Sequence, residues 1–567
     1  MLTGYPSVDK PWRKYYSEEA INTPLPECTI FEYLWDNNKN YPNDIAINYL
    51  GRKITYKTLF ENIDKTAAAF LNAGVKEKEI VTVALPSIPE ALYCVYALNK
   101  IGAVANMIHP LAGQSDAINY FNEVQSRVAV IFDGAYGDIA GGIDKTSIEA
   151  VIVASPADSL PVAMKTAYLF KHKKPVLDGR VFKSWKSFIK EGKGTTVFAT
   201  KKNCHEMAII SHTGGTTGEP KGVMCSDYSI LAEIWQLVID YPHSRQERYL
   251  PVIPPFHNYS LVNSMMVPLS CGFVVILLPK YEPEKFAEYV AQYGPNHIMS
   301  IPTYWEALLK IKELEKMDLS CLNHIFYGGE MMTPEMEEEV SNLLLSRGAK
   351  NPLYKGLGST EMTSAATMTY ESCNMPGSVG IPLARVNCKI VEPGTTNELS
   401  YGQEGEICFS GPTMMIGYYK HPKATNDIVK IHPDGERWLH TGDLGYLNED
   451  GVLFVSGRIK RILITRDCNG HGTKMFPDRI EKVIYSHPNV QLCCVIGIPD
   501  EIRVNYPKAF VVLKNESLNA KNEIMNLCEK KLPEYMVPVE IAILDDLPRT
   551  AAGKIDYRAL EIMTKKN

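Results

Sequence analysis

The string most suited to chemistry is a loop rich in glycine and threonine, SHTGGTTGEPKG, at residues 211–222. Its glycines let backbone N–H groups crowd round a polyanion, its threonines add hydroxyl donors, and Lys221 supplies a positive charge. A P-loop NTPase would carry Gly directly before this lysine and Ser or Thr directly after it, whereas Pro220 and Gly222 take those places here. Taken alone, the string is either a structural glycine turn or a phosphate cradle that is not of the Walker type.

The loop resembles the TSGTTGxPKG signature of the adenylate-forming superfamily, which includes acyl-CoA and aryl-CoA synthetases, firefly luciferases and the adenylation domains of peptide synthetases. Gly214 stands where that signature usually has Ser. Six further strings resemble family motifs in the family's order: PPFHNYS (254–260), YGGE (327–330), GLGSTE (356–361), HTGDLG (440–445), GRIKR (457–461) and PRTAAGK (548–554). Seven motifs in order along nearly the whole chain make the resemblance specific.

The resemblance implies a site for ATP and Mg²⁺. Thr360 is implied to contact the α-phosphate and Glu361 to bind the magnesium ion, a hard cation that takes few protein ligands at nucleotide phosphates. Gly329 and Glu330 are implied to flank the adenine, together with Leu357, which stands where the family usually has an aromatic residue. The residues implied to hold the phosphates are Thr213, Gly215, Thr216, Thr217, Gly218 and Lys221.

Later motifs are implied to supply the ribose contacts and the catalytic lysine. Asp443 is suited to accept hydrogen bonds from both ribose hydroxyls, and Arg458 can donate to the same sugar. Lys554 is the implied catalytic lysine; a cation about 4 Å from the developing charge, at an effective dielectric of ~20, is worth ~4 kcal/mol, or about three decades in rate. Lys460 is the implied hinge about which the carboxy-terminal domain rotates to admit coenzyme A. The loop at 465–476 departs from the short family pattern, so coenzyme A contacts there are not predicted.

The chemistry predicted is that of an AMP-forming acid–CoA ligase. A carboxylic acid with a pKa near ~4 is already ionised at neutral pH, so its attack on the α-phosphorus of ATP needs no general base. The obstacle is the approach of two anions, which cations and preorganised donors can relieve. The thiol of coenzyme A, with a pKa near ~8.5, then attacks the acyl-adenylate, from which adenylate departs readily.

The acid is predicted only by class. His257, which we include among the catalytic residues, stands where amino-acid-activating relatives carry Asp, so an amino acid is not expected. Gly358 stands where acetate-specific relatives carry Trp, so an acid larger than acetate is expected. A medium- or long-chain fatty acid is favoured, and an aryl acid stays open. Candidate lining residues, which ordinary core positions would explain equally well, are Tyr259, Trp305, Tyr327 and Met362.

The elements that must position these motifs follow an alternating pattern. From Ile80 to about Pro279, short β-branched runs alternate with helical segments, which predicts parallel α/β structure. Beyond about Glu404, shorter runs divided by Gly and Asp turns predict a distorted sheet or small barrel. The strands expected are 81–85, 128–132, 207–210, 273–278, 297–301, 406–410 and 452–456, with a helix at 283–293.

After Gly457 the sequence predicts a helix opened by Pro477, strands at 491–498 and 508–513, and a last pair of helices. We therefore expect a fold of class α/β in two domains. Residues 1–457 would form a large N-terminal domain of stacked α/β sheets plus a small barrel-like subdomain, and residues 458–567 a small mobile α+β C-terminal domain.

Composition limits the partners and the compartment. The net charge of −6 argues against nucleic acid as a partner, and no apolar run is long enough for a membrane span. Thirteen scattered cysteines and the lack of a signal peptide predict a cytoplasmic protein. Three alternatives stay open: an acyl-AMP ligase that loads a carrier protein, a luciferase, and a nucleotide-binding protein without catalysis.

Overall fold

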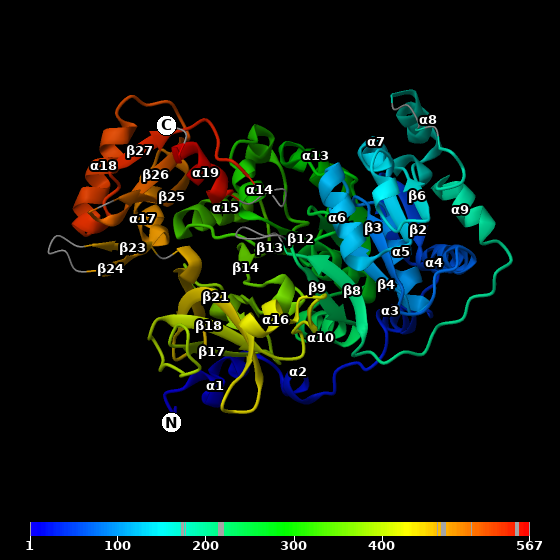
Figure 1. Ribbon diagram of the computed structural model, residues 1–567, viewed down its shortest axis with the longest axis horizontal. Helices are drawn as coiled ribbons and strands as arrows, with labels where there is room; N and C mark the ends of the chain where they lie inside the picture. The colour runs from blue at the N-terminus through cyan, green and yellow to red at the C-terminus, as the bar shows by residue number, and fades with distance from the viewer. Residues whose placement is uncertain are drawn as a thin grey trace.

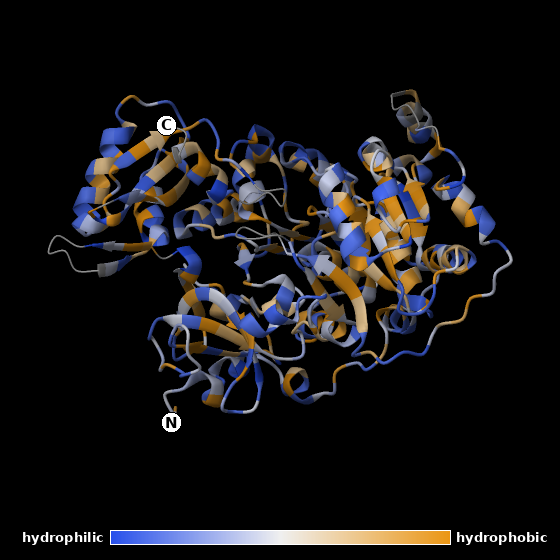
Figure 2. Ribbon diagram, viewed as in Figure 1, coloured by the Kyte–Doolittle hydropathy of each residue, from blue (hydrophilic) through white to orange (hydrophobic). Residues whose placement is uncertain are grey.

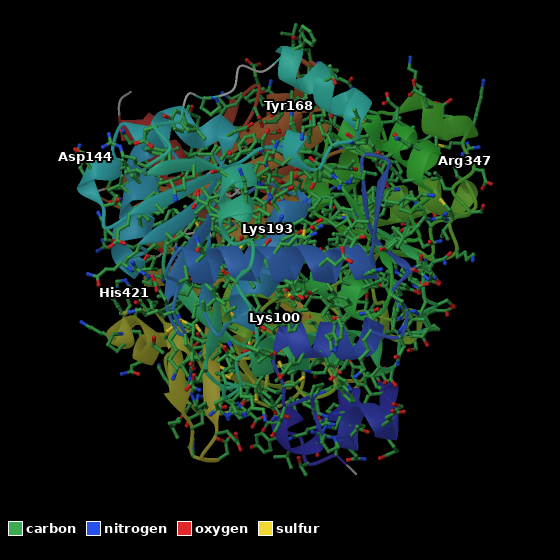
Figure 3. The ribbon with its side chains drawn as sticks, turned by 90° about the vertical axis from the view of Figure 1, so that its right-hand side faces the viewer. Lys100, Asp144, Tyr168, Lys193, Arg347 and His421 are labelled. Atoms are coloured by element: carbon green, nitrogen blue, oxygen red, sulfur yellow. The ribbon has the colours of Figure 1, made fainter. Side chains whose placement is uncertain are left out.

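The computed structural model describes residues 2–171, 175, 177–213, 220–461, 463–466, 472–500, 502–549 and 555–565 (Figure 1). Two large sheets and the helices around them form most of the chain, and the two sheets lie side by side. In Figure 3, Asp144 marks the side of one sheet and Arg347 marks the side of the other. Within the described part of the chain, no helix combines the length and apolar character needed to cross a bilayer.

The first sheet has seven strands in the order β14-β13-β12-β10-β11-β1-β2, and only β2 is antiparallel to its neighbour. The second has eight strands in the order β19-β9-β8-β4-β3-β5-β6-β7. The pairs β8–β9 and β9–β19 are antiparallel, and all other neighbours in this sheet are parallel. The bounds are β1 Ile45–Tyr49, β2 Arg52–Thr55, β3 Ile80–Ala84, β4 Val104–Met107, β5 Val128–Phe132, β6 Ala150–Ala154, β7 Phe182–Ser184, β8 Met207–His212, β9 Gly222–Ser226, β10 Arg248–Pro251, β11 Val274–Leu277, β12 His297–Ser300, β13 His324–Tyr327, β14 Tyr354–Lys355 and β19 Gly417–Tyr418.

The helices cover these sheets or lie in the largest hydrophobic core, to which strands of both sheets contribute. Helices α5 and α10 are buried along almost their whole length, as expected of helices that are apolar on most sides. Figure 2 shows the hydrophobic residues concentrated on the strands. The bounds are α1 Pro6–Asp9, α2 Glu18–Asn22, α3 Ile30–Asn38, α4 Tyr56–Asn72, α5 Pro89–Lys100, α6 Gln114–Val124, α7 Tyr136–Ala140, α8 Val162–Lys171, α9 Trp185–Glu191, α10 Asp227–Val238, α13 Phe286–Tyr293, α14 Pro302–Leu308 and α15 Pro334–Ser346.

A smaller antiparallel sheet follows, built around the long strand β21 (Arg437–Leu447). Strand β21 pairs with β18 on one side, and with β20 and then β22 along the other. The other strands of this sheet are β17 Asn387–Val391, β18 Gly405–Ser410, β20 Val429–Ile431 and β22 Leu453–Arg458, and α16 spans Pro422–Ile428. A separate pair of short strands, β15 Thr367–Met368 and β16 Ile381–Pro382, precedes β17 in the chain.

The last part of the chain has its own sheets and cores. In β25, Cys493 and Val495 face a core shared with α17 and α18, whereas Cys494 and Ile496 face a core shared with Leu560 of α19, because successive strand residues point to opposite faces. The bounds are β23 Leu463–Arg466, β24 Gly472–Met475, α17 Pro477–Tyr485, β25 Val490–Asp500, β26 Val504–Leu513, α18 Ala520–Lys531, β27 Glu540–Ile543 and α19 Tyr557–Lys565.

The predicted strands are confirmed as β3, β5, β8, β11, β12, β18 and β22, each shifted by a few residues at most. The helix predicted at 283–293 begins with a 3₁₀ turn at Pro283–Lys285 and continues as α13. The helix opened by Pro477 is confirmed, with Ile480 and Ile484 fully buried. The α/β class and a large N-terminal part of α/β sheets followed by a smaller C-terminal part are thus as expected.

Candidate active site

Four predicted motifs lie at the carboxyl ends of strands, where open α/β sheets bind their ligands. The glycine- and threonine-rich loop follows β8, PPFHNYS follows β10, YGGE overlaps the end of β13, and GLGSTE follows β14. Three of these strands belong to the seven-stranded sheet and β8 to the eight-stranded sheet. The topology therefore gathers segments that lie far apart in the sequence.

The stem of the phosphate loop is a closed hairpin. The backbone N–H of Thr213 donates to the Lys221 carbonyl over 3.1 Å, and the Lys221 N–H donates to the Thr213 hydroxyl oxygen over 3.2 Å. The predicted phosphate ligands Gly215, Thr216, Thr217 and Gly218 fall outside the described residues. The structure thus fixes where the loop begins and ends.

Tyr418 joins the predicted phosphate lysine to the predicted magnesium ligand. The Lys221 ammonium lies 5.6 Å from the centroid of the Tyr418 ring, and the Tyr418 hydroxyl donates to Glu361 Oε1 over 2.6 Å. Burial, and then the negative charge of Glu361, raise the pKa of Tyr418, so that its hydroxyl stays a donor at neutral pH. Sequence reasoning missed this residue, since it reaches the site only because β19 pairs with β9.

The site suits one magnesium ion held mainly by its nucleotide. Tyr418 occupies one oxygen of Glu361, and magnesium commonly binds one or two carboxylates together with phosphates and water. No cluster of three or more His, Cys, Asp or Glu side chains with metal-binding geometry occurs among the described residues. The second carboxylate oxygen of Glu361 is the one that would hold the ion.

The GLGSTE and YGGE segments pass close to each other. A Cβ on Gly328 would lie 3.2 Å from the Gly356 carbonyl oxygen, and the Gly356 N–H donates to the Tyr327 carbonyl over 3.2 Å. The Leu357 carbonyl accepts N–H donors from Ala366 and Thr367. The backbones of the two segments assigned to the adenine are therefore in contact.

Thr360 and Glu361 lie in a tight turn that depends on Gly358. They belong to the 3₁₀ turn η8 (Thr360–Met362), and Gly358 pairs across it with Ala365. A Cβ on Gly358 would lie only 1.8 Å from the Ser364 carbonyl oxygen. The backbone conformation of this turn therefore requires glycine at position 358.

The predicted ribose residues are partners across two strands. Asp443 of β21 lies opposite Arg458 of β22, and Arg458 Nε is 2.7 Å from Asp443 Oδ1. The Asp443 side chain is 12% exposed and that of Arg458 is 55% exposed, so the carboxylate is held while the guanidinium faces solvent. The carboxylate of Asp443 and the guanidinium of Arg458 thus offer a hydrogen-bond acceptor and a donor side by side.

Glu406 fixes the backbone that leads to Asp443, and sequence reasoning missed Glu406. Its Oε1 accepts the Gly442 N–H over 3.2 Å, and its Oε2 lies 2.9 Å from His440 Nδ1. Thr441 adds two bonds to the same turn, donating its hydroxyl to the Ile407 carbonyl and accepting the Asp443 N–H. The backbone before Asp443 is therefore fixed.

The predicted hinge lies beside two ion-pair systems, which the Arg458 backbone N–H connects by donating to Asp478 over 3.2 Å. Arg458 pairs with Asp443 of the small antiparallel sheet, whereas Arg461 forms ion pairs with Asp478 and Glu481 of the last part of the chain. Lys460, between them in the 3₁₀ turn η10 (Ile459–Arg461), is exposed. The boundary at residues 457/458 and the rotation stay predictions, and Lys554 falls outside the described residues.

The acyl-pocket motif opens a helix. His257 precedes α11 (Asn258–Ser260), its ring centroid 4.0 Å from that of Phe256. Tyr259 donates to the Ser300 carbonyl over 2.8 Å, and its hydroxyl lies 3.3 Å from where a Cβ on Gly328 would be. Of the four candidate lining residues, Tyr259 alone is placed here; Trp305, Tyr327 and Met362 are buried in the hydrophobic cores.

The first prediction concerns Asp443. We expect Asp443→Asn to raise the KM for ATP by about 10- to 100-fold, because hydrogen bonds to a charged acceptor are worth about 1.5–3 kcal/mol. The matched control is Asp450→Asn, which removes an exposed carboxylate paired with Lys14 and should change the KM for ATP less than twofold. An unchanged KM in Asp443→Asn would remove this residue from the ribose site.

Comparison with known proteins identifies the family of this chain. The family model for AMP-binding enzymes matches residues 34–419, and the model for the AMP-binding enzyme C-terminal domain matches residues 479–554. The long-chain-fatty-acid–CoA ligase of Bacillus subtilis (strain 168) is 29% identical over 566 residues, covering 97% of each chain. Probable 4-coumarate–CoA ligase 1 of Dictyostelium discoideum is 26% identical over 549 residues, covering 95% of this chain and 96% of the relative.

A solved structure shares the fold. The anthranilate CoA ligase AuaEII in complex with anthranoyl-AMP superposes with a TM-score of 0.81 at 22% identity, covering 96% of this chain and 98% of that one. The first family match spans well over half of this chain, and the C-terminal match adds residues 479–554. The chain therefore belongs to the family of AMP-binding enzymes.

Proposed function

We propose that this protein is an ATP-dependent acid–CoA ligase. It converts a carboxylate and ATP to an acyl-adenylate and pyrophosphate, and then transfers the acyl group to the thiol of coenzyme A, releasing AMP. The observation that carries the proposal is the convergence of Lys221, Tyr418 and Glu361 on one edge of the sheets. Fatty and aryl acids are the candidate substrates, as the names of its relatives suggest.

The first half-reaction is an electrostatic problem. The acid is ionised, so the site must lower the cost of bringing a carboxylate to the α-phosphorus. The proposed roles are charge neutralisation by Lys221 and Lys554, contact of Thr360 with the α-phosphate, and binding of Mg²⁺ by Glu361. When bound, the ion neutralises charge on the phosphates. The nucleotide is oriented by Asp443 and Arg458 at the ribose.

The second half-reaction needs access for a large thiol. The exposed position of Lys460, in a short turn between the small antiparallel sheet and the last part of the chain, supports a hinge here. Rotation about Lys460 would withdraw Lys554 and admit coenzyme A. We also place the enzyme in the cytoplasm, since the twelve described cysteines are all free thiols, as is usual in a reducing compartment.

Pyrophosphate release tests the proposed function. The enzyme is assayed with ATP, Mg²⁺ and acids from acetate to palmitate together with benzoates and cinnamates, each with and without coenzyme A. We expect continuous turnover only when coenzyme A is present. Equal turnover without coenzyme A would instead indicate an acyl-AMP ligase, and no release with any acid would contradict catalysis.

The role of Lys554 is tested on the separate half-reactions. We expect Lys554→Ala to slow adenylate formation by about 1,000-fold, the loss of roughly 4 kcal/mol of charge stabilisation, and to change thioester formation from supplied acyl-adenylate less than tenfold. Lys531→Ala, which removes an exposed lysine of the same part of the chain, is the control and should be unaffected in both assays. An equal loss in the two half-reactions would contradict the assigned role.

A further inference from the structure

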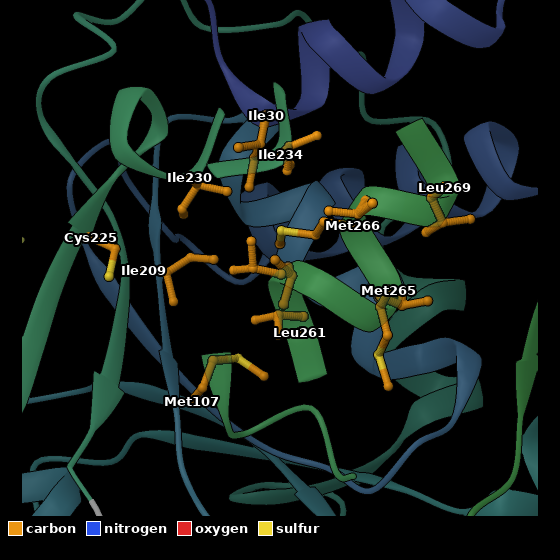
Figure 4. Close-up of a cluster of buried hydrophobic side chains, with 14 of the residues drawn as sticks. Ile30, Met107, Ile209, Cys225, Ile230, Ile234, Leu261, Met265, Met266 and Leu269 are labelled. Atoms are coloured by element: carbon orange, nitrogen blue, oxygen red, sulfur yellow. The ribbon is translucent and has the colours of Figure 1, made fainter. Parts of the chain in front are cut away.

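Part of the small antiparallel sheet buries polar side chains. Glu406 of β18 and His440 of β21 are 7% and 5% exposed, and His432, directly after β20, is 3% exposed. The largest core, by contrast, is apolar where α10, the π-helical turn η5 (Leu261–Met266) and α12 (Val267–Ser270) meet (Figure 4). Burying polar groups costs free energy unless they are paired, so the polar cluster is held by specific hydrogen bonds.

These three side chains form one chain of hydrogen bonds that ends at the ribose turn. His432 Nε2 lies 2.9 Å from His440 Nε2, and His440 Nδ1 lies 2.9 Å from Glu406 Oε2. The other oxygen, Glu406 Oε1, accepts the Gly442 N–H over 3.2 Å. Gly442 directly precedes Asp443. His432 is therefore linked to the backbone that positions the ribose carboxylate.

The hydrogen bonds assign one proton to each ring. Burial opposes ionisation of Glu406, but the hydrogen bond from His440 outweighs it and lowers the pKa of Glu406, so the carboxylate accepts. His440 then donates from Nδ1 and its Nε2 carries a lone pair, which accepts the Nε2 proton of His432. Among the described residues His432 Nδ1 has no partner, so a proton there would have no acceptor. Both rings are therefore neutral, each in one tautomer.

The charges around His432 favour the same state. Burial and then the Lys389 ammonium lower the pKa of His432 to about 4; His440 and Lys430 act in the same direction, and Asp434 opposes them. The Lys389 ammonium is held 2.9 Å from Asp434 Oδ2, in a side chain that is 4% exposed. The ring of His432 therefore stays neutral at pH 7 and keeps its Nε2 proton for His440.

The turn at the other end of the chain needs this support. Gly442 has a φ of +72°, and a Cβ there would meet nothing within 4 Å, so no side chain packs against this position. A glycine adopts many backbone conformations, and hydrogen bonds must select one of them. The Gly442 N–H supplies one such bond to Glu406. The direction of the Asp443 side chain therefore depends on where the Glu406 carboxylate is held.

We infer that His432 is a positioning residue for ATP. By donating to His440 it holds the Glu406 carboxylate on the Gly442 N–H, and so fixes Asp443 for the two ribose hydroxyls. This inference rests on the proposed function, because it requires Asp443 to bind the ribose. Residues that orient a direct ligand contribute to binding even though they do not touch the bound group.

Asparagine and glutamine separate the two ring nitrogens of His432. A Gln amide reaches close to the position of Nε2 and can donate to His440, whereas an Asn amide reaches only as far as Nδ1. We expect His432→Asn to raise the KM for ATP by about tenfold with kcat changed less than about twofold, as for a lost partner that orients a metal ligand. We expect His432→Gln to stay within about threefold of the wild-type enzyme.

The control for these variants is His205→Leu, which removes an exposed histidine before β8 and should change the KM for ATP less than about twofold. All are assayed by pyrophosphate release with coenzyme A and the best acid of the panel. Equal KM values for ATP in His432→Asn and His432→Gln would overturn the inference, because only the Gln amide reaches His440.

A nucleotide without ribose hydroxyls separates positioning from a general structural effect. With 2′,3′-dideoxy-ATP, Asp443 has no hydroxyl to bind, so its exact position no longer affects the rate. We expect His432→Asn to lower kcat/KM about tenfold with ATP but less than about threefold with 2′,3′-dideoxy-ATP. A loss by the same factor with both nucleotides would show a purely structural role and would overturn the inference.

Glu406→Gln tests the chain from its other end and decides the matter if His432→Asn does not fold. A Gln amide has one oxygen, so it can accept from Gly442 or from His440 but not from both. We expect the same loss with ATP and the same sparing of 2′,3′-dideoxy-ATP. Absence of pyrophosphate release by the wild-type enzyme with every acid would contradict the proposed function itself, whereas equal losses on both nucleotides would contradict only the positioning role.

Discussion

The arrangement of this site depends on the repulsion between two anions, the carboxylate of the acid and the triphosphate of ATP. Charge neutralisation must come from groups that are already in place, because reorganising them during the reaction would cost free energy. In the proposed function Lys221 supplies one positive charge and Glu361 would hold Mg²⁺, and Tyr418 contacts both residues although the three lie far apart in the chain. The hairpin β8–β9 holds the lysine, and β19 brings the tyrosine to it.

The same constraint explains the close packing of backbone in the GLGSTE turn. Thr360 and Glu361 lie in a sharp reversal of the chain, which Gly358 permits because no side chain would fit beside the Ser364 carbonyl. Glu233 accepts a hydrogen bond from Ala365 at the end of this turn, and it also lies beside Asn263. The buried carboxyl group of Glu233 therefore joins helix α10 to the backbone that follows the GLGSTE motif.

Much of the fold could be predicted from the sequence, because the strands are short β-branched runs and the last helices begin at clear signals such as Pro477. The motifs also predicted which residues to examine, and the structure brings Asp443 and Arg458 together as partners across two strands. Contacts set by strand pairing could not be predicted. Tyr418 and Glu406 carry no local signal, and each reaches its partner only through tertiary structure.

The acyl pocket was the least predictable part for a related reason. Aromatic and apolar residues near a motif have the same local sequence whether they line a cavity or fill a core, and Trp305, Tyr327 and Met362 are core residues. Burial of this kind is decided by tertiary packing, which no local sequence pattern reports.

The central claim is that the carboxylate oxygen attacks the α-phosphorus of ATP. The most direct measurement uses an acid labelled with ¹⁸O in its carboxylate and determines by mass spectrometry where the label goes after turnover with ATP and coenzyme A. The account predicts one ¹⁸O in each AMP formed and none in pyrophosphate, because the bond made to the α-phosphorus retains the acid's oxygen when the thiol releases AMP. Label in pyrophosphate or inorganic phosphate, or unlabelled AMP, would contradict it.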